Sequence, residues 1–346
     1  MRSLIRIGLA SILIGPHGIA QSATGEPAAE VEKFFREFVG LTDDQVRDVR
    51  GGRAVAKVLE SRTPDEVFVF GAVYIHAAPE RYLSLASDID ALRKLPSFIA
   101  LREFSNPPQI ADLDGFVLND KDLDELKHCR PAHCEVQLPT EAIEKLQHSV
   151  DWTAPDSSAQ ANRLAQQMAL EALLRYQQGG NIALGTYRDK SHPTAVAETF
   201  TSLLSQMKAL PIYLPDLNRY LIDYPNAASN EIRSAFYWEK VNFGLKPTLR
   251  IVQAIVYRGT SPDRPACAVA LKQLYASHYF ETALDLTVCV SDKRNGFYLI
   301  TIKGSQQAGL TGFKGGIVRK VAVDKTHSSL QKALAIYKEK LESQTE

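Results

Sequence analysis

The last third of the chain constrains the fold most, because strand-forming runs follow one another there and then give way to one long helical pattern. Four runs are rich in β-branched and aromatic residues and are bounded by Gly, Pro, Asn or Asp: SAFYWEKVNF, PTLRIVQAIVYRG, CAVALKQLYASHYFETALDLTVCVSD and GFYLITIKG. After GLTGFKGG, apolar residues recur at helical spacing, at Ile317, Val321, Leu330, Leu334, Tyr337 and Leu341. We therefore expect consecutive antiparallel strands followed by a long C-terminal helix.

Residues 66–104 predict a strand, a helix and a second strand. Val67–Ile75 is dense in Val, Phe, Tyr and Ile, as strands are. Pro79 stands where a first helical turn accepts proline, and an apolar helical face follows it. Pro96 ends this helix, and SFIALREF predicts the second strand.

Between these two strand-forming parts, residues 106–232 predict helices. Asp, Glu, Leu, Ala and Gln dominate, and β-branched runs disappear. One long helix is expected to end at Gly179–Gly180, and further helices are expected at Thr194 to Met207 and at Pro215 to Ile222. Residues 26–60 also carry a helical pattern and are interpreted as a helical lead-in.

Residues 1–22 predict a secretory signal peptide. Two arginines precede a short apolar run, Ile7–Ile14, and small residues follow it. The run is too short for a membrane span of about 20 residues, so no transmembrane segment is expected. We predict cleavage after Ser22 or Ala23 and a periplasmic or secreted chain; an uncleaved interfacial anchor is the alternative.

The four cysteines are expected to favour disulfides, because an exported chain meets an oxidising compartment. Cys129 and Cys134 flank a turn at Pro131 and predict a local disulfide. The surrounding HCRPAHC also offers zinc ligands, but four ligands from seven consecutive residues would be cramped, so no metal is expected. Cys267 and Cys289 can pair only if their strands are neighbours, and we expect that this pair does not form.

The order of elements resembles the START-like helix-grip (SRPBCC) superfamily. The resemblance is carried by VFVFGAVYIHAAPERYLSLASDIDALRKLP, by GFYLITIKG and by GGIVRKVAVDKTHSSLQKALAIYKEKLE. It implies an α+β fold in which a curved antiparallel sheet grips the long C-terminal helix around an apolar cavity. Residues 65–105 and 233–346 would form this domain, and residues 106–232 would be a mainly helical insertion.

Two polar residues of the third strand-forming run are candidates for the cavity. If Cys267 opposes Cys289, then Lys272 and His278 share the buried face, where they could bind a ligand head group or act in acid–base chemistry. Two alternatives remain open: His278 lies at a solvated strand end, or a one-residue bulge reverses the faces. Aromatic residues of the same strands either line the cavity or form plain core; they are Tyr237, Trp238, Tyr257, Tyr275 and Tyr279.

Composition and motifs narrow the function. Forty basic and forty acidic residues give zero formal charge without long runs of one sign, so nucleic acid is not expected as a partner. The glycine-rich GSQQAGLTGFKGG lacks the ending of a phosphate loop, and neither His-Glu-x-x-His nor Gly-x-Ser-x-Gly occurs, so no cofactor is expected.

Three functions remain open. The first is an exported binding protein that holds a lipid or another apolar small molecule, and we favour it because no catalytic constellation is evident. The second is a cyclase- or hydrolase-type enzyme on the same fold, and the third is an interaction protein with a filled cavity. The sequence does not name a protein partner.

Overall fold

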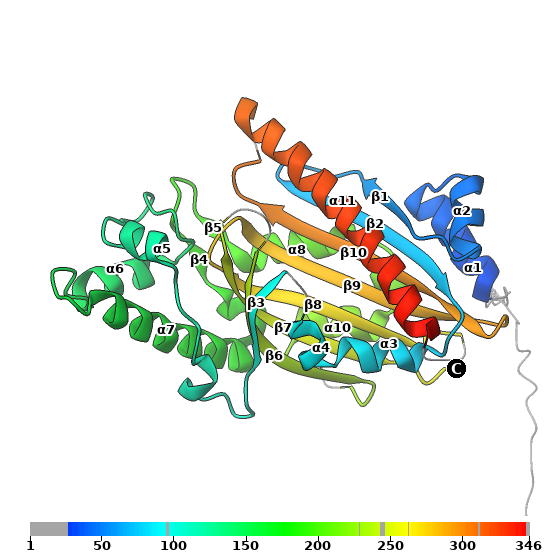
Figure 1. The fold of residues 1–346 in the computed structure, drawn as a ribbon, viewed down its shortest axis with the longest axis horizontal. Coiled ribbons are helices and arrows are strands. Elements are labelled where there is room, and N and C mark those ends of the chain that lie inside the picture. Colours follow the sequence, from blue (N-terminus) through cyan, green and yellow to red (C-terminus); the bar gives the residue numbers. More distant parts are fainter. Residues whose placement is uncertain are drawn as a thin grey trace, which may run out of the picture.

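An eight-stranded antiparallel sheet organises the protein in the computed structural model, which describes residues 27–94, 97–227, 229–242, 246–261, 263–310 and 312–343 (Figure 1). The strand order is β1-β2-β10-β9-β8-β7-β6-β3. The strands are β1 (Val55–Leu59), β2 (Glu66–Ile75), β3 (Phe98–Glu103), β6 (Ile232–Val241), β7 (Thr248–Arg258), β8 (Cys267–Ala276), β9 (Phe280–Asp292) and β10 (Gly296–Gln307). The predicted signal peptide and its cleavage site lie outside the described residues.

Two pairings join distant parts of the chain. β2 lies beside β10, with Ile75 opposite Phe297 and Glu66 opposite Gln306. β3 lies beside β6, so the chain leaves the sheet after β3 and returns on the adjacent strand. Helices occupy most of the chain between these two points, as the sequence predicts; the exact domain boundaries stay a prediction.

One face of the sheet carries the terminal helix. α11 (Gly312–Ser343), α3 (Pro79–Ala86) and α4 (Ile89–Arg93) lie on this side (Figure 1). Leu330, Leu334 and Leu341 of α11 pack in one core with Val69 and Val73 of β2. At the point of closest approach β2 has a glycine, Gly71, because a Cβ there would stand 2.7 Å from Leu334 Cδ1. The helix therefore lies directly on the strand, without a cavity between them at this point.

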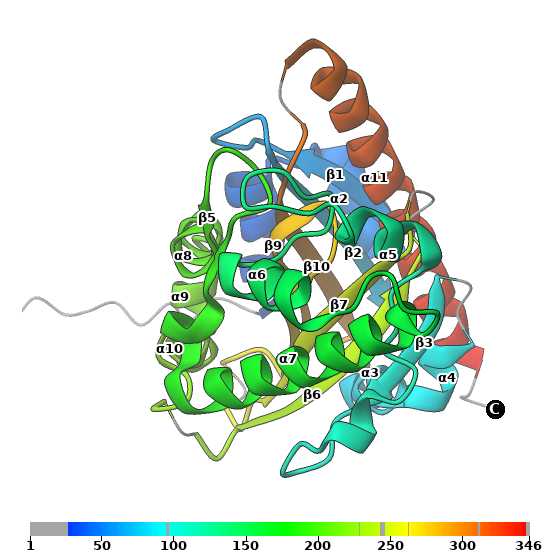
Figure 2. The same cartoon turned by 90° about the vertical axis from the view of Figure 1, so that its left-hand side faces the viewer.

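The opposite face carries the remaining helices, which gives three layers (Figure 2). Figure 2 shows α11 on one side of the strands and α8, α9 and α10 on the other. The helices on the face opposite α11 are α1 (Pro27–Phe34), η1 (Phe35–Val39), α2 (Asp43–Arg50), η2 (Ile110–Leu113), α5 (Asp120–Leu126), α6 (Thr140–Ser149), α7 (Ser157–Gly179), η3 (Gly180–Leu184), α8 (Val196–Gln206), α9 (Leu210–Tyr213) and α10 (Pro215–Asp223). A short hairpin, β4 (Thr186–Tyr187) and β5 (Thr194–Ala195), connects η3 to α8.

The predicted fold class is confirmed, since an antiparallel sheet, a long terminal helix and an intervening helical block are all present, and this arrangement is consistent with a helix-grip fold. The helical lead-in was wrong for its last residues, because Val55–Leu59 forms β1. Gly51–Gly52 ends the preceding helix, and the chain then pairs with the edge of β2. The predicted helix after Pro79 is also interrupted, because the side chain of Asp88 starts a new helix by accepting from the backbone N–H of Ala91.

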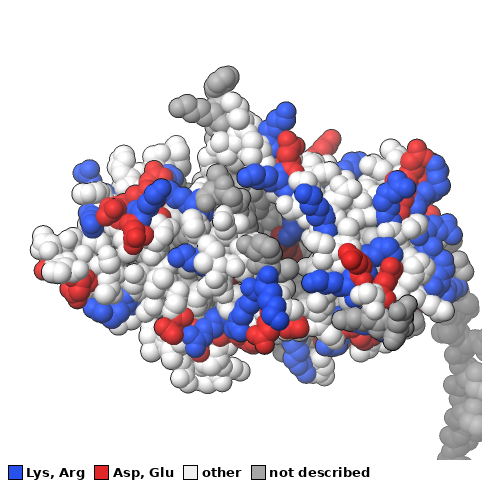
Figure 3. Space-filling view, in the orientation of Figure 1, with Lys and Arg blue, Asp and Glu red and all other residues white. Residues whose placement is uncertain are grey.

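The surface mixes charges of both signs. Figure 3 shows Lys and Arg side chains intermingled with Asp and Glu side chains over the face that carries α11. Among the described helices, none is both long enough and apolar enough to cross a membrane.

The close contact at Gly71 predicts the effect of one added methyl group. In a Gly71→Ala variant, Cβ would stand 2.7 Å from Leu334 Cδ1 and 2.9 Å from Leu330 Cγ, so these side chains must repack or α11 must shift. We expect the free energy of unfolding to fall by about 1–3 kcal/mol, measured by chemical denaturation.

The matched control is Gly316→Ala within α11, where the added Cβ meets no atom within 4 Å. This variant should be neutral or more stable by up to about 1 kcal/mol. Unchanged stability of the Gly71→Ala variant would mean that α11 does not lie directly on β2.

Candidate functional site

Lys272 is fully buried in the middle of β8. It lies opposite Gln253 of β7 and Leu284 of β9, and Cys267 lies opposite Cys289, which is the register on which the sequence-based expectation of a buried Lys272 depends. The only register shift between β7 and β8 follows Lys272, so the strand faces up to this residue are not reversed. Because side chains alternate along a strand, Lys272 shares its face with Ala268 and Ala270, which pack under α8 to α10. The lysine therefore points away from α11.

The partners of the Lys272 ammonium group are all uncharged. Nζ donates to the hydroxyl of Tyr176 at 2.9 Å and to the side-chain oxygen of Asn181. It also lies 4.2 Å from the ring centroid of Phe200, within the range of a cation–π contact. The Tyr176 hydroxyl in turn donates to Oε1 of Gln253 at 2.7 Å. Three helical elements and two strands thus meet at one amine.

Burial dominates the electrostatics of this group. It lowers the pKa of the Lys272 ammonium to about 7, since removal from water penalises the charged form. Burial also raises the pKa of Tyr176, so its hydroxyl stays neutral. Within the described part of the chain, no carboxylate forms an ion pair with Lys272. The site therefore holds a cation, or a neutral amine near pH 7, without a counter-ion.

A pocket of about 580 Å³ lies beside this network, and Asn181 belongs to both. The Asn181 amide nitrogen donates to the backbone oxygens of Leu221 and Ile222, at 3.0 and 2.9 Å, which ties η3 to α10. Tyr224 also lines the pocket, and its ring stacks on Tyr176 with centroids 5.2 Å apart. Asn181 and Tyr224 thus form a polar floor with Lys272 and Tyr176 behind it.

The rim of this pocket is partly apolar. Ile182 is 92% exposed and Ile222 is 50% exposed, although both side chains are large and apolar. Arg219 and Asp223 contribute one charge of each sign, and Arg219 is already paired with Asp216 at 2.8 Å. The pocket therefore joins an apolar entrance to a hydrogen-bonding floor.

A second, smaller groove of about 410 Å³ follows the edge strand β3. It is lined by Arg93, Ile99, Ala100, Leu101, Arg102, Asp114, Gly115 and Trp238. The indole N–H of Trp238 donates to the backbone oxygen of Asp112 at 2.7 Å, and its ring packs edge-on against Phe116. Because the one predicted site residue here already has an internal partner, this groove is the weaker candidate.

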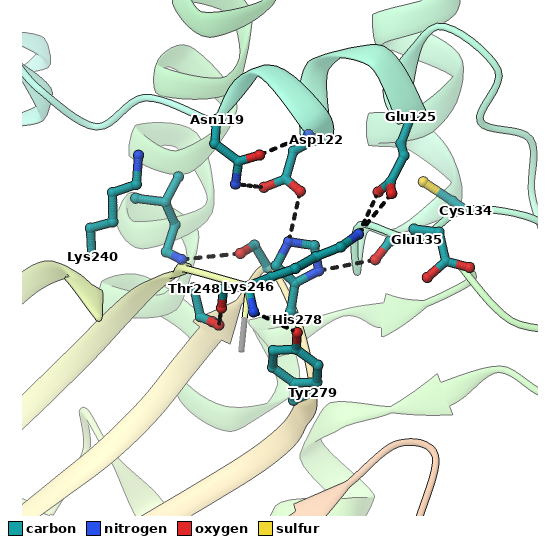
Figure 4. Close-up of polar contacts among 12 residues, drawn as sticks. Asn119, Asp122, Glu125, Cys134, Glu135, Lys240, Lys246, Thr248, His278 and Tyr279 are labelled. Atoms are coloured by element: carbon teal, nitrogen blue, oxygen red, sulfur yellow. Dashed lines mark hydrogen bonds and ion pairs between the residues drawn. The ribbon is translucent and has the colours of Figure 1, made fainter. Parts of the chain in front are cut away.

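His278 lies in a separate buried cluster at the junction of the sheet and α5 (Figure 4). Its Nε2 is 3.1 Å from a carboxylate oxygen of Asp122, and its Nδ1 is 3.1 Å from the backbone oxygen of Glu135. Asn119 donates to the other oxygen of Asp122 at 2.7 Å. Both ring nitrogens thus lie close to oxygen atoms, one of a carboxylate and one of the backbone. The alternative of a solvated His278 was wrong.

A second ion pair flanks this cluster. Lys246 lies 2.7 Å from a carboxylate oxygen of Glu125, one turn beyond Asp122 on α5. The backbone N–H of Lys246 donates to the Tyr279 hydroxyl at 3.0 Å. Figure 4 shows Asp122 and Glu125 pointing from α5 toward His278 and Lys246 at the end of the sheet. The cluster ties the helical block to the sheet.

The structure does not gather the predicted site residues in one cavity. Tyr237 and Trp238 are consecutive in β6 and point to opposite faces of the sheet. Trp238 and Tyr275 pack in the core beneath α5 to α7, whereas Tyr257 packs beneath α8 to α10. Tyr279 belongs to the junction with α5. Of this set, Trp238 lines the smaller groove beside β3, and only Lys272 is linked to the larger pocket, through Asn181.

The predicted local disulfide between Cys129 and Cys134 is confirmed. Cys267 and Cys289 are directly opposed on β8 and β9 but remain free and buried thiols, as expected.

The sequence interpretation missed several contributors to the site, among them Tyr176, Asn181, Gln253 and Asp122. Gln253 carried a usable signal, because it is a polar residue inside the apolar run IVQAIVY. Asn181 follows the glycines that end α7 and looks like an ordinary loop residue. Asp122 is one of several acidic residues in α5, and only tertiary structure sets it against His278.

Comparisons with known proteins add no assignment. A search against protein-family models found no match, and a search of curated proteins found no significant match. The fold and the pocket are therefore the basis for function.

Because Lys272 is buried, we expect the difference in the free energy of unfolding between the wild type and a Lys272→Met variant to depend on pH. In the unfolded chain the lysine has its ordinary pKa of 10.5, whereas in the folded protein the pKa is about 7. Between these values the unfolded chain binds the additional proton, so wild-type stability should rise with pH relative to the variant, by about 1.4 kcal/mol per pH unit. Below about pH 7 the difference should be constant, because both states are protonated.

Urea unfolding of the two proteins across this pH window measures the difference. Lys208→Met is the control, because Lys208 is exposed, and this variant should follow the wild type at every pH. A constant difference between the wild type and Lys272→Met would contradict the uncompensated burial of the amine.

The contact between Asp122 and His278 predicts that the stability of the protein depends on this one carboxylate. Asp122→Asn removes a buried charge that faces the imidazole, and we expect a loss of about 3 kcal/mol in the free energy of unfolding. Asp120→Asn makes the same change on the same helix at an exposed position and should alter stability by less than about 0.5 kcal/mol. Chemical denaturation compares the two, and equal effects would refute a special role for Asp122.

Proposed function

We propose that this protein is an exported binding module for a small molecule with an apolar part and a polar head group. The ligand would occupy the pocket formed by α7, η3 and α10. One observation carries the proposal: a pocket of about 580 Å³ with an apolar rim and a polar floor. Typical small-molecule sites have about 300–1,000 Å³ and combine apolar walls with a few polar groups.

The rim and the floor suit different parts of such a ligand. Ile182 and Ile222 expose apolar surface that a hydrocarbon part would cover, and covering it is favourable by about 25 cal/mol per Å². Tyr224 lines the pocket, and burial raises the pKa of its hydroxyl to about 12, so this group stays protonated at neutral pH. A ligand with one polar end is the simplest match.

Membership of the START-like superfamily and export are parts of this proposal. The antiparallel sheet and terminal helix support the first, and the Cys129–Cys134 disulfide supports the second. The ligand position differs from the one that the resemblance implies, between sheet and terminal helix, because Leu330 and Leu334 contact β2 directly at Gly71.

The interaction-protein alternative is supported by that same filled contact between α11 and β2. The enzyme alternative would use Lys272, His278 or nearby tyrosines, and these residues lie in separate clusters rather than around one cavity. Binding at the pocket beside Asn181 is therefore the function we favour.

The proposal predicts that a bound apolar molecule is recovered from the protein and lost when the pocket is filled. Organic-solvent extracts of purified protein are examined by mass spectrometry. Asn226 lines the pocket and is exposed, so Asn226→Trp should fill the space without disturbing the fold and should reduce the recovered ligand at least about ten-fold.

Asn230→Trp is the matched control, since Asn230 is an exposed asparagine of the same loop that does not line the pocket. It should retain wild-type ligand content. An empty extract from the wild type, or equal ligand in both variants, would refute the proposed pocket and favour the interaction-protein alternative.

A further inference from the structure

We propose that the ligand of this pocket carries a carboxylate head group whose negative charge is balanced by Lys272. This inference rests on the proposed function, because it concerns the same pocket, and it adds the chemical class of the ligand. The two observations behind it are the uncharged surroundings of a fully buried lysine and the direct contact of that lysine with the pocket residue Asn181.

A buried ammonium group without a counter-ion is costly, since burial of a charge is tolerated chiefly when the charge is paired. Each contact of Nζ is to a neutral group: the Tyr176 hydroxyl, the Asn181 amide oxygen and the Phe200 ring. Methionine or leucine would fill this space without an electrostatic cost. The position is therefore explained best by an anion that arrives with the ligand.

Asn181 is the residue that links the lysine to the pocket. Its amide oxygen accepts from Nζ, and the residue lines the pocket, as Tyr224 does. It belongs to the short η3, which starts at Gly180 and is followed by Gly185, both with positive φ. A carboxylate that enters from the pocket can replace the amide oxygen of Asn181 as the acceptor of Nζ. Charge-assisted hydrogen bonds of this kind are about twice as strong as neutral ones.

The other ionisable groups around Lys272 do not supply this charge. Tyr176 on α7 and Tyr220 and Tyr224 on α10 have pKa values raised by burial, so they are neutral at physiological pH. At the rim, Arg219 and Asp223 have opposite signs, and Asp216 already pairs with Arg219. Binding of a carboxylate should therefore follow the protonation of Lys272 and weaken above about pH 7.

Calorimetric titration of the delipidated full chain with decanoate and with 1-decanol tests this inference, because the two probes share a hydrocarbon chain and differ in the head group. At about pH 6 we expect decanoate to bind at least about ten-fold more tightly than decanol. At about pH 9 this preference should largely disappear, since the amine is then neutral.

Lys272→Met separates the role of the lysine from general binding. It should remove the preference for decanoate over decanol, whereas Lys208→Met, at an exposed position, should keep the preference of the wild type. Chemical denaturation verifies that both variants are folded.

The possible results distinguish a failure of the carboxylate inference from a failure of the proposed binding function. Equal binding of both probes, or a preference for decanoate that survives in Lys272→Met, overturns the carboxylate inference and leaves the proposed binding function standing. Failure of decanoate to bind at either pH also overturns the inference, and together with an empty solvent extract it overturns the binding function too. A preference lost both in Lys272→Met and at high pH supports both.

Discussion

The pairing of β2 with β10 is the constraint on which the rest of the structure depends. It joins residues near the start of the chain to the last strand, over an unbroken ladder from Ile75 and Phe297 to Glu66 and Gln306. With this ladder in place, one face of β2 meets α11 and the other meets α1 and α2. A one-residue slip would exchange the two faces, so the register decides which helices can pack where.

The same division into two faces determines what each side can do. The α11 face is closed by leucines that reach Gly71, which favours stability over binding at that point. The other face is covered by several shorter helices, and a pocket lies where α7 and α10 both end. A polar residue on this face, such as Lys272, can be reached from a pocket without opening the sheet.

Much of the fold could be predicted because its signals are local. Pro79 marks the start of α3, Gly179–Gly180 mark the end of α7, and two cysteines around a turn form the disulfide. β1 was missed because it has only five residues, too few for a strand-like alternation to stand out beside the preceding helical pattern.

The candidate site was predictable only in part. Alternation along β8 and β9 places Lys272 on a buried face, but it cannot tell which helices cover that face. Tyr176 fits the apolar stripe of α7, and nothing in the sequence shows that its hydroxyl bridges Lys272 and Gln253. Asp122 and His278 meet only through the packing of α5 against the sheet.

The disulfide makes the contacts between the helical block and the sheet depend on whether Cys129 and Cys134 are oxidised. Cys134 is followed by Glu135, whose backbone oxygen lies against His278, and then by Gln137, whose N–H donates to the backbone oxygen of Ser277 at 2.8 Å. Oxidation of the two thiols narrows the motion of the segment that supplies these contacts. The oxidised protein therefore holds the helical block in a more defined position on the sheet than the reduced protein would.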